Sequence, residues 1–293
     1  MNRYRLPASF RKDGTAALLF LAPSAAGFLL FYAIPFAMGL SYSFTDRTSG
    51  GHFVGFANYA ALLESSSFRK AAANTLLFTC TSVPLLMVLS LMLALFLNRS
   101  LALRNWLQTA FVLPLVVPVA SIVMVWQILF DWNGAVNAWL LGFGWDRTDW
   151  MQSEGAMGVL VLLYIWKNIG YDLILFLAGL QAIPASYYET ARIEGAGVFR
   201  RFLHVTLVYL TPTTVFIVLI SIINSFKVFR ETYLLAGDYP YDRIYMLQHY
   251  MNNMFVSLDI QKLTAAATIM VIGILVLVNL LFAADRRFQA FME

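Results

Sequence analysis

Residues 183–197 read Ile-Pro-Ala-Ser-Tyr-Tyr-Glu-Thr-Ala-Arg-Ile-Glu-Gly-Ala-Gly, a polar stretch between two long apolar runs. The stretch is too polar to span a bilayer. Ser186, with Glu189 three residues later, fits a capping box, and Gly195 and Gly197 supply a stop signal. The pattern predicts a helix of about two turns, whereas an isolated helix in water needs roughly 12 residues. A contact with another segment or another protein must therefore hold this helix in place.

The composition of the whole chain is that of an integral membrane protein. Its 293 residues are 60% hydrophobic and only 12% charged, whereas a soluble domain carries about 25% charged residues. The net charge of +4 is small and no basic run alternates with stacking aromatic residues, which argues against a nucleic-acid partner. The first uncharged run, residues 14–45, is far longer than the roughly 7–15 apolar residues of a signal peptide. We therefore expect it to stay in the membrane as an anchor.

Six apolar runs are each long enough to cross a bilayer as a helix. Pro23 and Pro35 interrupt the first run, and we expect its helix to begin or bend near Pro23; Pro114 and Pro118 predict a kink in the third. No internal repeat or detachable linker is apparent, so the predicted fold is an all-α polytopic membrane protein with one transmembrane domain over residues 1–293. A tryptophan-rich loop, 131–155, and a long polar connection, 227–262, separate later spans. The expected spans are residues 15–44, 71–97, 106–130, 156–180, 203–226 and 263–284.

The distribution of Lys and Arg predicts the topology. An even number of spans places both termini on one side, and basic residues are densest in the short connections on that side. The 181–202 loop belongs to the same side. We therefore expect both termini and this loop to be cytoplasmic. The basic residues that carry the argument lie at Arg3, Arg5, Arg11, Lys12, Arg99, Arg104, Arg192, Arg200, Arg201, Arg286 and Arg287.

Several kinds of chemistry lack a sequence signature. No Gly-x-x-x-x-Gly-Lys-Ser/Thr phosphate loop occurs, so we expect this chain not to hydrolyse ATP itself. The three histidines and the single cysteine are far apart and show no metal-ligand spacing, which predicts no metal site. No recognisable set of catalytic residues is present either. An intramembrane enzyme with a site assembled from distant residues stays open as an alternative.

Polar residues within two of the spans are candidates for a substrate pathway. Lys167, Asn168 and Asp172 lie near the middle of the fourth span, where a charge costs about 3 kcal/mol on insertion scales. They must face protein or a water-filled cavity, where they can bind a substrate's hydroxyl groups. Asn224 and Lys227 on the fifth span are the second candidates. The alternative is that these groups serve only as polar contacts between helices.

The opening stretch also resembles a known family signature. Residues 188–196, followed by Phe202, Thr206, Leu207 and Pro212, resemble the "EAA" segment of binding-protein-dependent ABC importer permeases. Thr190, Glu194 and Val208 depart mildly from the usual pattern. The remaining matches resemble the sugar-uptake branch, in particular its maltose-type first permease, and cover nearly the whole chain. They lie at residues 53–59, 74–75, 113–114, 166–170, 177–184 and 236–240.

The resemblance implies a function and a set of partners. The fold would be that of a type I ABC importer permease, forming half of a pathway for a sugar or oligosaccharide across the bacterial inner membrane. The helix in the 181–202 loop would be a coupling helix that docks on an ATPase subunit. The partners would be a second permease, two ATPase subunits carrying ATP and Mg, an extracellular or periplasmic binding protein and membrane lipid. The implied ATPase-coupling residues are Tyr188, Glu189, Ala191, Arg192, Glu194, Gly195 and Gly197.

Other functions stay open at this point. Within the importer class, the cargo is an amino acid, a peptide or a glycerol phosphate if the sugar inference fails. A secondary carrier would work without an ATPase. The charged, glycine-ended 181–202 loop favours the importer. A coupling helix needs an ATPase subunit to dock on, whereas a secondary carrier works without one.

Overall fold

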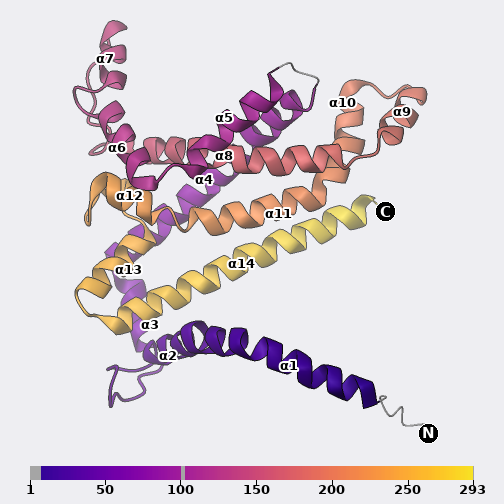
Figure 1. The fold of residues 1–293 in the computed structure, drawn as a ribbon. Helices are drawn as coiled ribbons and strands as arrows, with labels where there is room; N and C mark the ends of the chain where they lie inside the picture. The colour runs from indigo at the N-terminus through magenta and orange to yellow at the C-terminus, as the bar shows by residue number, and fades with distance from the viewer. Residues whose placement is uncertain (1–7, 100–102, 293) are drawn as a thin grey trace. The chain divides into compact units, whose positions relative to one another are not determined.

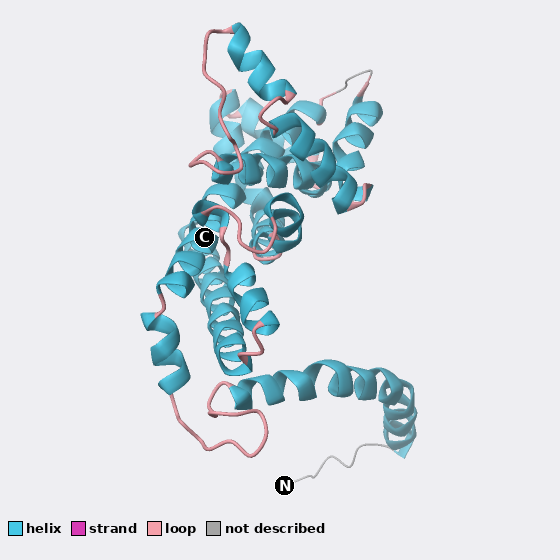
Figure 2. Cartoon of the chain, turned by 90° about the vertical axis from the view of Figure 1, so that its left-hand side faces the viewer, coloured by secondary structure: helices cyan, strands magenta, loops and turns pink. Residues whose placement is uncertain are grey.

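The computed structural model describes residues 8–99 and 103–292, and over these residues the chain is almost entirely helical (Figures 1 and 2). An isolated bridge between Thr45 and Phe53 is the one β-type pairing in the described part. The chain divides into two compact units, Met1–Leu62 with Met254–Thr268, and Leu63–Asn253 with Ile269–Glu293. The single domain over residues 1–293 stays a prediction. Arg3 and Arg5 of the topology argument lie outside the described residues.

The first unit contains the N-terminal apolar run. Helix α1 (Ala8–Phe28) passes through a π-helical turn (Leu29–Ala33) into α2 (Ile34–Tyr42). Pro23 lies inside α1, so the expected helix start near Pro23 is wrong, while a bend at Pro23 stays a prediction. The irregular turn ends two residues before Pro35, whose missing N–H removes one bond from the helical ladder. A short helix, α3 (Ala57–Glu64), follows the loop, and Asn58 donates hydrogen bonds to the Ser43 and Thr45 carbonyl oxygens.

The second unit is built around α8 (Ala156–Gln181). Helix α4 (Ser66–Leu97) packs along α8, and α11 (Leu207–Ser225) contacts both (Figure 1). Their shared core contains Ala94, Phe176 and Leu210, all fully buried. The part of α14 (Ile260–Met292) that belongs to this unit packs through Met270, among others, on α4 and α11.

The expected third span is two helices instead of one. Helix α5 (Arg104–Val116) ends before Pro118, and α6 (Val119–Phe130) begins after it. Pro118 disfavours a helical conformation at Val117, which is extended, and so breaks the run more sharply than the predicted kink. On α8, Gly170 lies against the backbone of Phe111 on α5, and a Cβ at this position would collide with it.

Short helices occupy two stretches that the sequence assigns to loops. Helix α7 (Ala135–Gly142) lies within the tryptophan-rich loop. The long polar connection contains α12 (Phe229–Ala236), a 3-10 helix (Asp242–Ile244) and α13 (Leu247–Val256). Leu235 of α12 packs on Trp126 of α6 near the N-terminal half of α8. These helices are held by packing, which hydropathy along the chain does not reveal.

Six helical stretches in the described residues are long and apolar enough to cross a membrane. This number agrees with the six predicted spans, although the boundaries differ most for the third and fifth. The all-α fold with six spans is therefore confirmed. The candidate spans are Leu19–Tyr42, Ser66–Leu97, Val119–Gly142, Ala156–Gln181, Val198–Ala236 and Ile260–Arg286.

Candidate functional site

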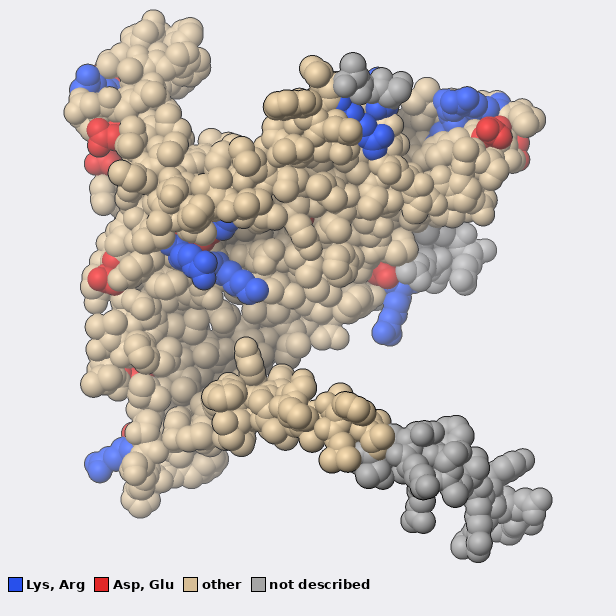
Figure 3. Space-filling model, in the orientation of Figure 1, with Lys and Arg blue, Asp and Glu red and all other residues tan. Residues whose placement is uncertain are grey.

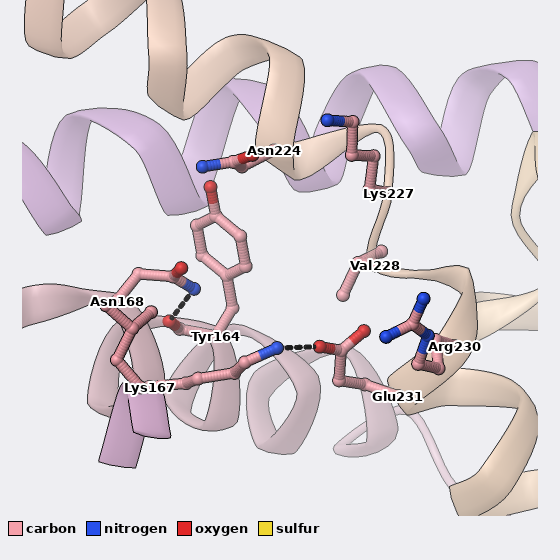
Figure 4. Close-up of a pocket in the computed structure, with 9 residues that line it drawn as sticks. Tyr164, Lys167, Asn168, Asn224, Lys227, Val228, Arg230 and Glu231 are labelled. Atoms are coloured by element: carbon pink, nitrogen blue, oxygen red, sulfur yellow. Dashed lines mark hydrogen bonds and ion pairs between the residues drawn. The ribbon is translucent and has the colours of Figure 1, made fainter. Parts of the chain in front are cut away.

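A polar cavity of about 270 Å³ lies between α8 and the junction of α11 with α12 (Figure 4). Four of the five predicted pathway residues line it, which brings together side chains almost 60 positions apart in the sequence. The fifth, Asp172, lies elsewhere. The cavity is lined by Leu115, Tyr164, Lys167, Asn168, Asn224, Lys227, Val228, Arg230 and Glu231.

Lys167 forms an ion pair with Glu231 across the cavity (Figure 4). The side chains are only 17% and 8% exposed, so each charge compensates the other where water is scarce. Glu231 was absent from the predicted site because it lies on α12, a helix that the sequence does not predict within the polar connection. A charge in the middle of a span requires a partner. The predicted set offered one carboxylate, Asp172, but the structure pairs Lys167 with Glu231 and Asp172 with Ser221.

The amide and phenol groups of the cavity are partly fixed by hydrogen bonds to the backbone. Asn168 donates from Nδ2 to the Tyr164 carbonyl oxygen at 2.8 Å, one turn earlier on α8. The Tyr164 hydroxyl donates to the Ser221 carbonyl oxygen at 2.9 Å and so joins α8 to α11. Asn224 makes no side-chain hydrogen bond within the described part of the chain. Its amide is available to a bound molecule.

Lys227 and Arg230 add two further positive charges at the cavity (Figure 4). Both side chains are exposed, so they can reach solvent or a ligand. Neither forms an ion pair with any carboxylate among the described residues. Because Glu231 balances Lys167, the described cavity carries an excess of positive charge.

Asp172 lies apart from this cavity. Its side chain is buried, and the Ser221 hydroxyl donates to Asp172 Oδ2 at 3.2 Å. The Asp172 carboxylate therefore links α8 with α11 within the protein. This placement favours the alternative for Asp172, a polar contact between helices.

The 181–202 loop forms a short helix, as predicted, but its N-terminus differs from the prediction. Helix α9 (Ala185–Ile193) begins after Pro184 and has no side-chain cap, so the capping box assigned to Ser186 and Glu189 is wrong. The N-cap position is occupied by Pro184, two residues before Ser186. Ser186 lies inside the first turn instead.

The C-terminus of α9 ends as the sequence predicts. Gly195 has a φ of +77°, its N–H donates to the Arg192 carbonyl oxygen, and the Ala196 N–H donates to the Ala191 carbonyl oxygen. This pair of bonds is a Schellman motif, which requires the left-handed conformation that glycine adopts without strain. Gly197 has a different role, because it precedes helix α10 (Val198–Arg201).

The residues proposed for ATPase coupling differ in exposure. Glu189, Arg192, Glu194, Gly195 and Gly197 are exposed, and Ala191 is half-buried. Tyr188 is also half-buried, and its hydroxyl shares a 3.0 Å hydrogen bond with the Thr206 hydroxyl, so it anchors α9 to the π-helical turn (Phe202–Thr206) that leads into α11.

Large apolar side chains project from the same loop. Ile193 is 88% exposed, Val198 is 77% exposed and Phe199 is 74% exposed. They neighbour the charged residues of α9 and α10, and Figure 3 shows a mixed group of blue and red atoms at this end of the second unit. None of these three residues is among the coupling residues that the resemblance implies, and Val198 and Phe199 follow the glycine stop.

Within the described residues, no group of three or more metal-ligating side chains comes together. The cavity contains one carboxylate, Glu231, and that carboxylate is paired with Lys167. The arrangement is suited to holding a polar molecule, since it combines cations with amide and hydroxyl groups.

Comparison with known families gives a match over most of the chain. The family described as "Binding-protein-dependent transport system inner membrane component" matches residues 86–290. The arabinooligosaccharides transport system permease protein AraP of Bacillus subtilis is 36% identical over 231 residues, which cover 77% of this chain and 74% of that protein. The sulfoquinovosyl glycerol transport system permease protein SmoG of Agrobacterium fabrum is 32% identical over 266 residues, which cover 88% of this chain and 86% of that protein.

A solved structure shares the fold. One chain of a bacterial ABC transporter involved in the import of the acidic polysaccharide alginate matches with a TM-score of 0.81. The match covers 95% of this chain and 97% of that chain at 24% sequence identity. This likeness supports the helical architecture described above.

Proposed function

Because this chain belongs to the family of binding-protein-dependent transport system inner membrane components, we propose that it forms half of the pathway of an ATP-driven importer for a sugar or oligosaccharide. The two relatives above have carbohydrate cargoes in their names, and the polar cavity offers amide, hydroxyl and charged groups suited to such a cargo. An extracellular or periplasmic binding protein would deliver the carbohydrate. A second permease would supply the other half of the pathway in the bacterial inner membrane.

The observation that carries the proposal is the exposed apolar group Ile193, Val198 and Phe199 on an otherwise charged loop. Exposed apolar side chains surrounded by charges are typical of a protein-binding site. The loop is too polar to lie in lipid, so we expect its binding partner to be a soluble protein. The ATPase subunit of an importer fits this requirement, with Glu189, Arg192 and Glu194 available for ion pairs at the rim.

The chain geometry connects this docking surface to the cavity. Helix α9 directly follows α8, which contributes Lys167 and Asn168, and leads through α10 into α11, which contributes Asn224. Lys167 lies 14 residues before the end of α8, about 21 Å along a helix. A movement of α9 on an ATPase would therefore shift both helices that border the cavity, which is how ATP hydrolysis would alternate access to it.

In this proposal, the chain itself performs no hydrolysis. ATP and Mg would bind to the two ATPase subunits, and the residues of α9 would transmit force without touching the nucleotide. The cytoplasmic position of α9 follows from the distribution of Lys and Arg and is part of the proposal.

Retention of the ATPase by the purified permease pair tests the proposal. We expect Phe199→Glu to reduce ATPase retention at least tenfold, because a carboxylate would be buried in the contact without a partner. Phe143→Glu is the matched control, since Phe143 is 66% exposed but lies beyond α7 at the other end of α8. Full retention of the ATPase by Phe199→Glu, or equal loss in both variants, contradicts docking on this loop.

A further inference from the structure

We propose that the carbohydrate held by the polar cavity carries an anionic group, which lies against Lys227 and Arg230. This inference rests on the proposed import function and narrows its substrate class. The cavity contains three cationic side chains and one carboxylate, and the ion pair of Lys167 with Glu231 accounts for one of each. The other two cations have no acidic partner among the described residues.

The surroundings make these two charges unusual. Lys227 and Arg230 lie toward the C-terminal end of the candidate stretch Val198–Ala236, and apolar Leu115 and Val228 lie beside them at the cavity. Figure 3 shows a group of blue atoms over the α11–α12 junction, with a small red patch beside it and tan surface around both. Cations beside apolar side chains are costly unless an opposite charge or water compensates them. A cargo anion would supply that compensation each time the site is filled.

The neighbouring groups suit the rest of a sugar acid. Asn224 and Lys227 lie on one side of the cavity and the Lys167–Glu231 pair on the other (Figure 4). The Asn224 amide can donate to and accept from sugar hydroxyls, while Lys227 and Arg230 can donate charge-assisted hydrogen bonds to a carboxylate, sulfonate or phosphate. A neutral sugar would use the amides and leave both cations without a partner. The combination therefore selects for hydroxyl groups and a negative charge on one molecule.

Direct binding of a matched pair of sugars tests this inference. The assembled importer is placed in phosphatidylcholine nanodiscs, which contain no anionic lipid, and binding of glucuronate and glucose is measured by saturation-transfer NMR. We expect glucuronate to bind at least tenfold more tightly than glucose, because only glucuronate can accept charge-assisted hydrogen bonds from both cations. Its affinity should fall with added salt. Equal affinities, or no glucuronate signal, would overturn the inference.

Variants separate the cavity from other cationic surface. The double variant Lys227→Gln, Arg230→Gln should lose at least tenfold in glucuronate affinity and should no longer bind glucuronate more tightly than glucose. The charge-conserving variant Lys227→Arg, Arg230→Lys should retain glucuronate, which excludes a loss caused by misassembly. Arg147→Gln removes a cation outside the cavity and should change neither affinity.

The outcomes also distinguish this inference from the proposed function. If Phe199→Glu loses the ATPase as expected but the cavity binds both sugars equally, the importer stands and the anionic cargo is wrong. If glucuronate binds as expected but ATPase retention does not depend on Phe199, the cavity assignment stands and the coupling surface is wrong. Glucuronate binding that is unaffected by the double variant places the anion elsewhere and overturns the inference.

Discussion

At the scale of single residues, Gly170 lets two helices meet without a side chain between them. A Cβ at Gly170 would collide with the backbone of Phe111, which cannot move aside as a flexible side chain would. We expect Gly170→Ala to lower the free energy of unfolding by about 1–3 kcal/mol, as overpacking does in other cores. Thermal unfolding in detergent measures this loss.

Gly158→Ala on the same helix is the control for Gly170. Nothing lies within 4 Å of the position that its Cβ would take, and alanine favours helix over glycine by about 1 kcal/mol. We expect this variant to be as stable as the natural chain or slightly more so. Equal unfolding temperatures for the two variants contradict the close approach of α8 and α5.

His249 is the residue from which we expect a dependence of stability on pH. It is fully buried beside Phe229, its Nδ1 accepts from the Met246 N–H, and burial lowers its pKa from 6.5 to about 4, although Asp238 opposes the shift. Between these two values the unfolded chain binds a proton that the folded chain does not. Stability is therefore complete above about pH 6.5 and falls as the pH drops toward 4, by at most about 3 kcal/mol.

The test for His249 compares two pH profiles. The unfolding free energy of the natural chain and of His249→Asn is measured between pH 4 and pH 7, because asparagine keeps an acceptor for Met246 but does not titrate. The natural chain should lose more stability on acidification than the variant. Parallel profiles would show that His249 does not contribute.

The residues of the cavity show where sequence reasoning succeeds and where it stops. Lys167, Asn168, Asn224 and Lys227 stood out because polar groups within apolar spans must face protein or water, and the structure brings all four together. Glu231 and Arg230 were missed, since they lie in a helix whose existence depends on packing against α6. The pairing of Lys167 with Glu231 depends on the tertiary structure, and the spacing of residues along the chain does not predict it.

At the scale of helices, the two ends of α9 were predicted with different success. The glycine stop was correct because a positive φ is a strong local requirement, whereas the capping box was displaced because Pro184 starts the helix earlier. Local sequence patterns did not predict α7, α12 and α13, because these helices lie in stretches without long apolar runs. Such helices are stabilised mainly by tertiary packing.

Hydrogen exchange of the α9 amides distinguishes these two ends. We expect Gly195→Val to speed exchange by about 5- to 30-fold, because a left-handed conformation costs a β-branched residue about 1–2 kcal/mol. Ser186→Ala should leave exchange nearly unchanged, since Ser186 makes no capping bond. If Ser186→Ala exchanged as fast as Gly195→Val, Ser186 would have to cap α9 after all.

At the scale of the whole molecule, the composition predicts the number of spans. It does not predict the other proteins with which this chain assembles. The all-α fold and the resemblance to importer permeases are confirmed, because hydropathy and the signature around Glu189 are both properties of the sequence. The partners are inferred from surfaces that this chain leaves uncovered. Exposed Ile193 and Phe199 indicate that a cover is required without identifying it.

The orientation of the chain in the membrane can be tested with two engineered cysteines. Helix α8 has 26 residues, about 39 Å of helix, which is enough to cross the roughly 30 Å hydrocarbon core. Phe143 precedes α8 in the chain and Glu194 follows it, and both residues are exposed. If the density of Lys and Arg sets the topology, Glu194 is cytoplasmic and Phe143 lies outside.

Labelling with a membrane-impermeant maleimide checks this orientation in a Cys80→Ser background, since Cys80 is the one native cysteine. The permease pair is produced without its ATPase, so that nothing covers α9. We expect Phe143→Cys to react in cells with a permeabilised outer membrane, and Glu194→Cys to react only after lysis. The reverse pattern would invert the topology and remove α9 from the reach of a cytoplasmic ATPase. Labelling of both cysteines from the same side would contradict α8 as a membrane-spanning helix.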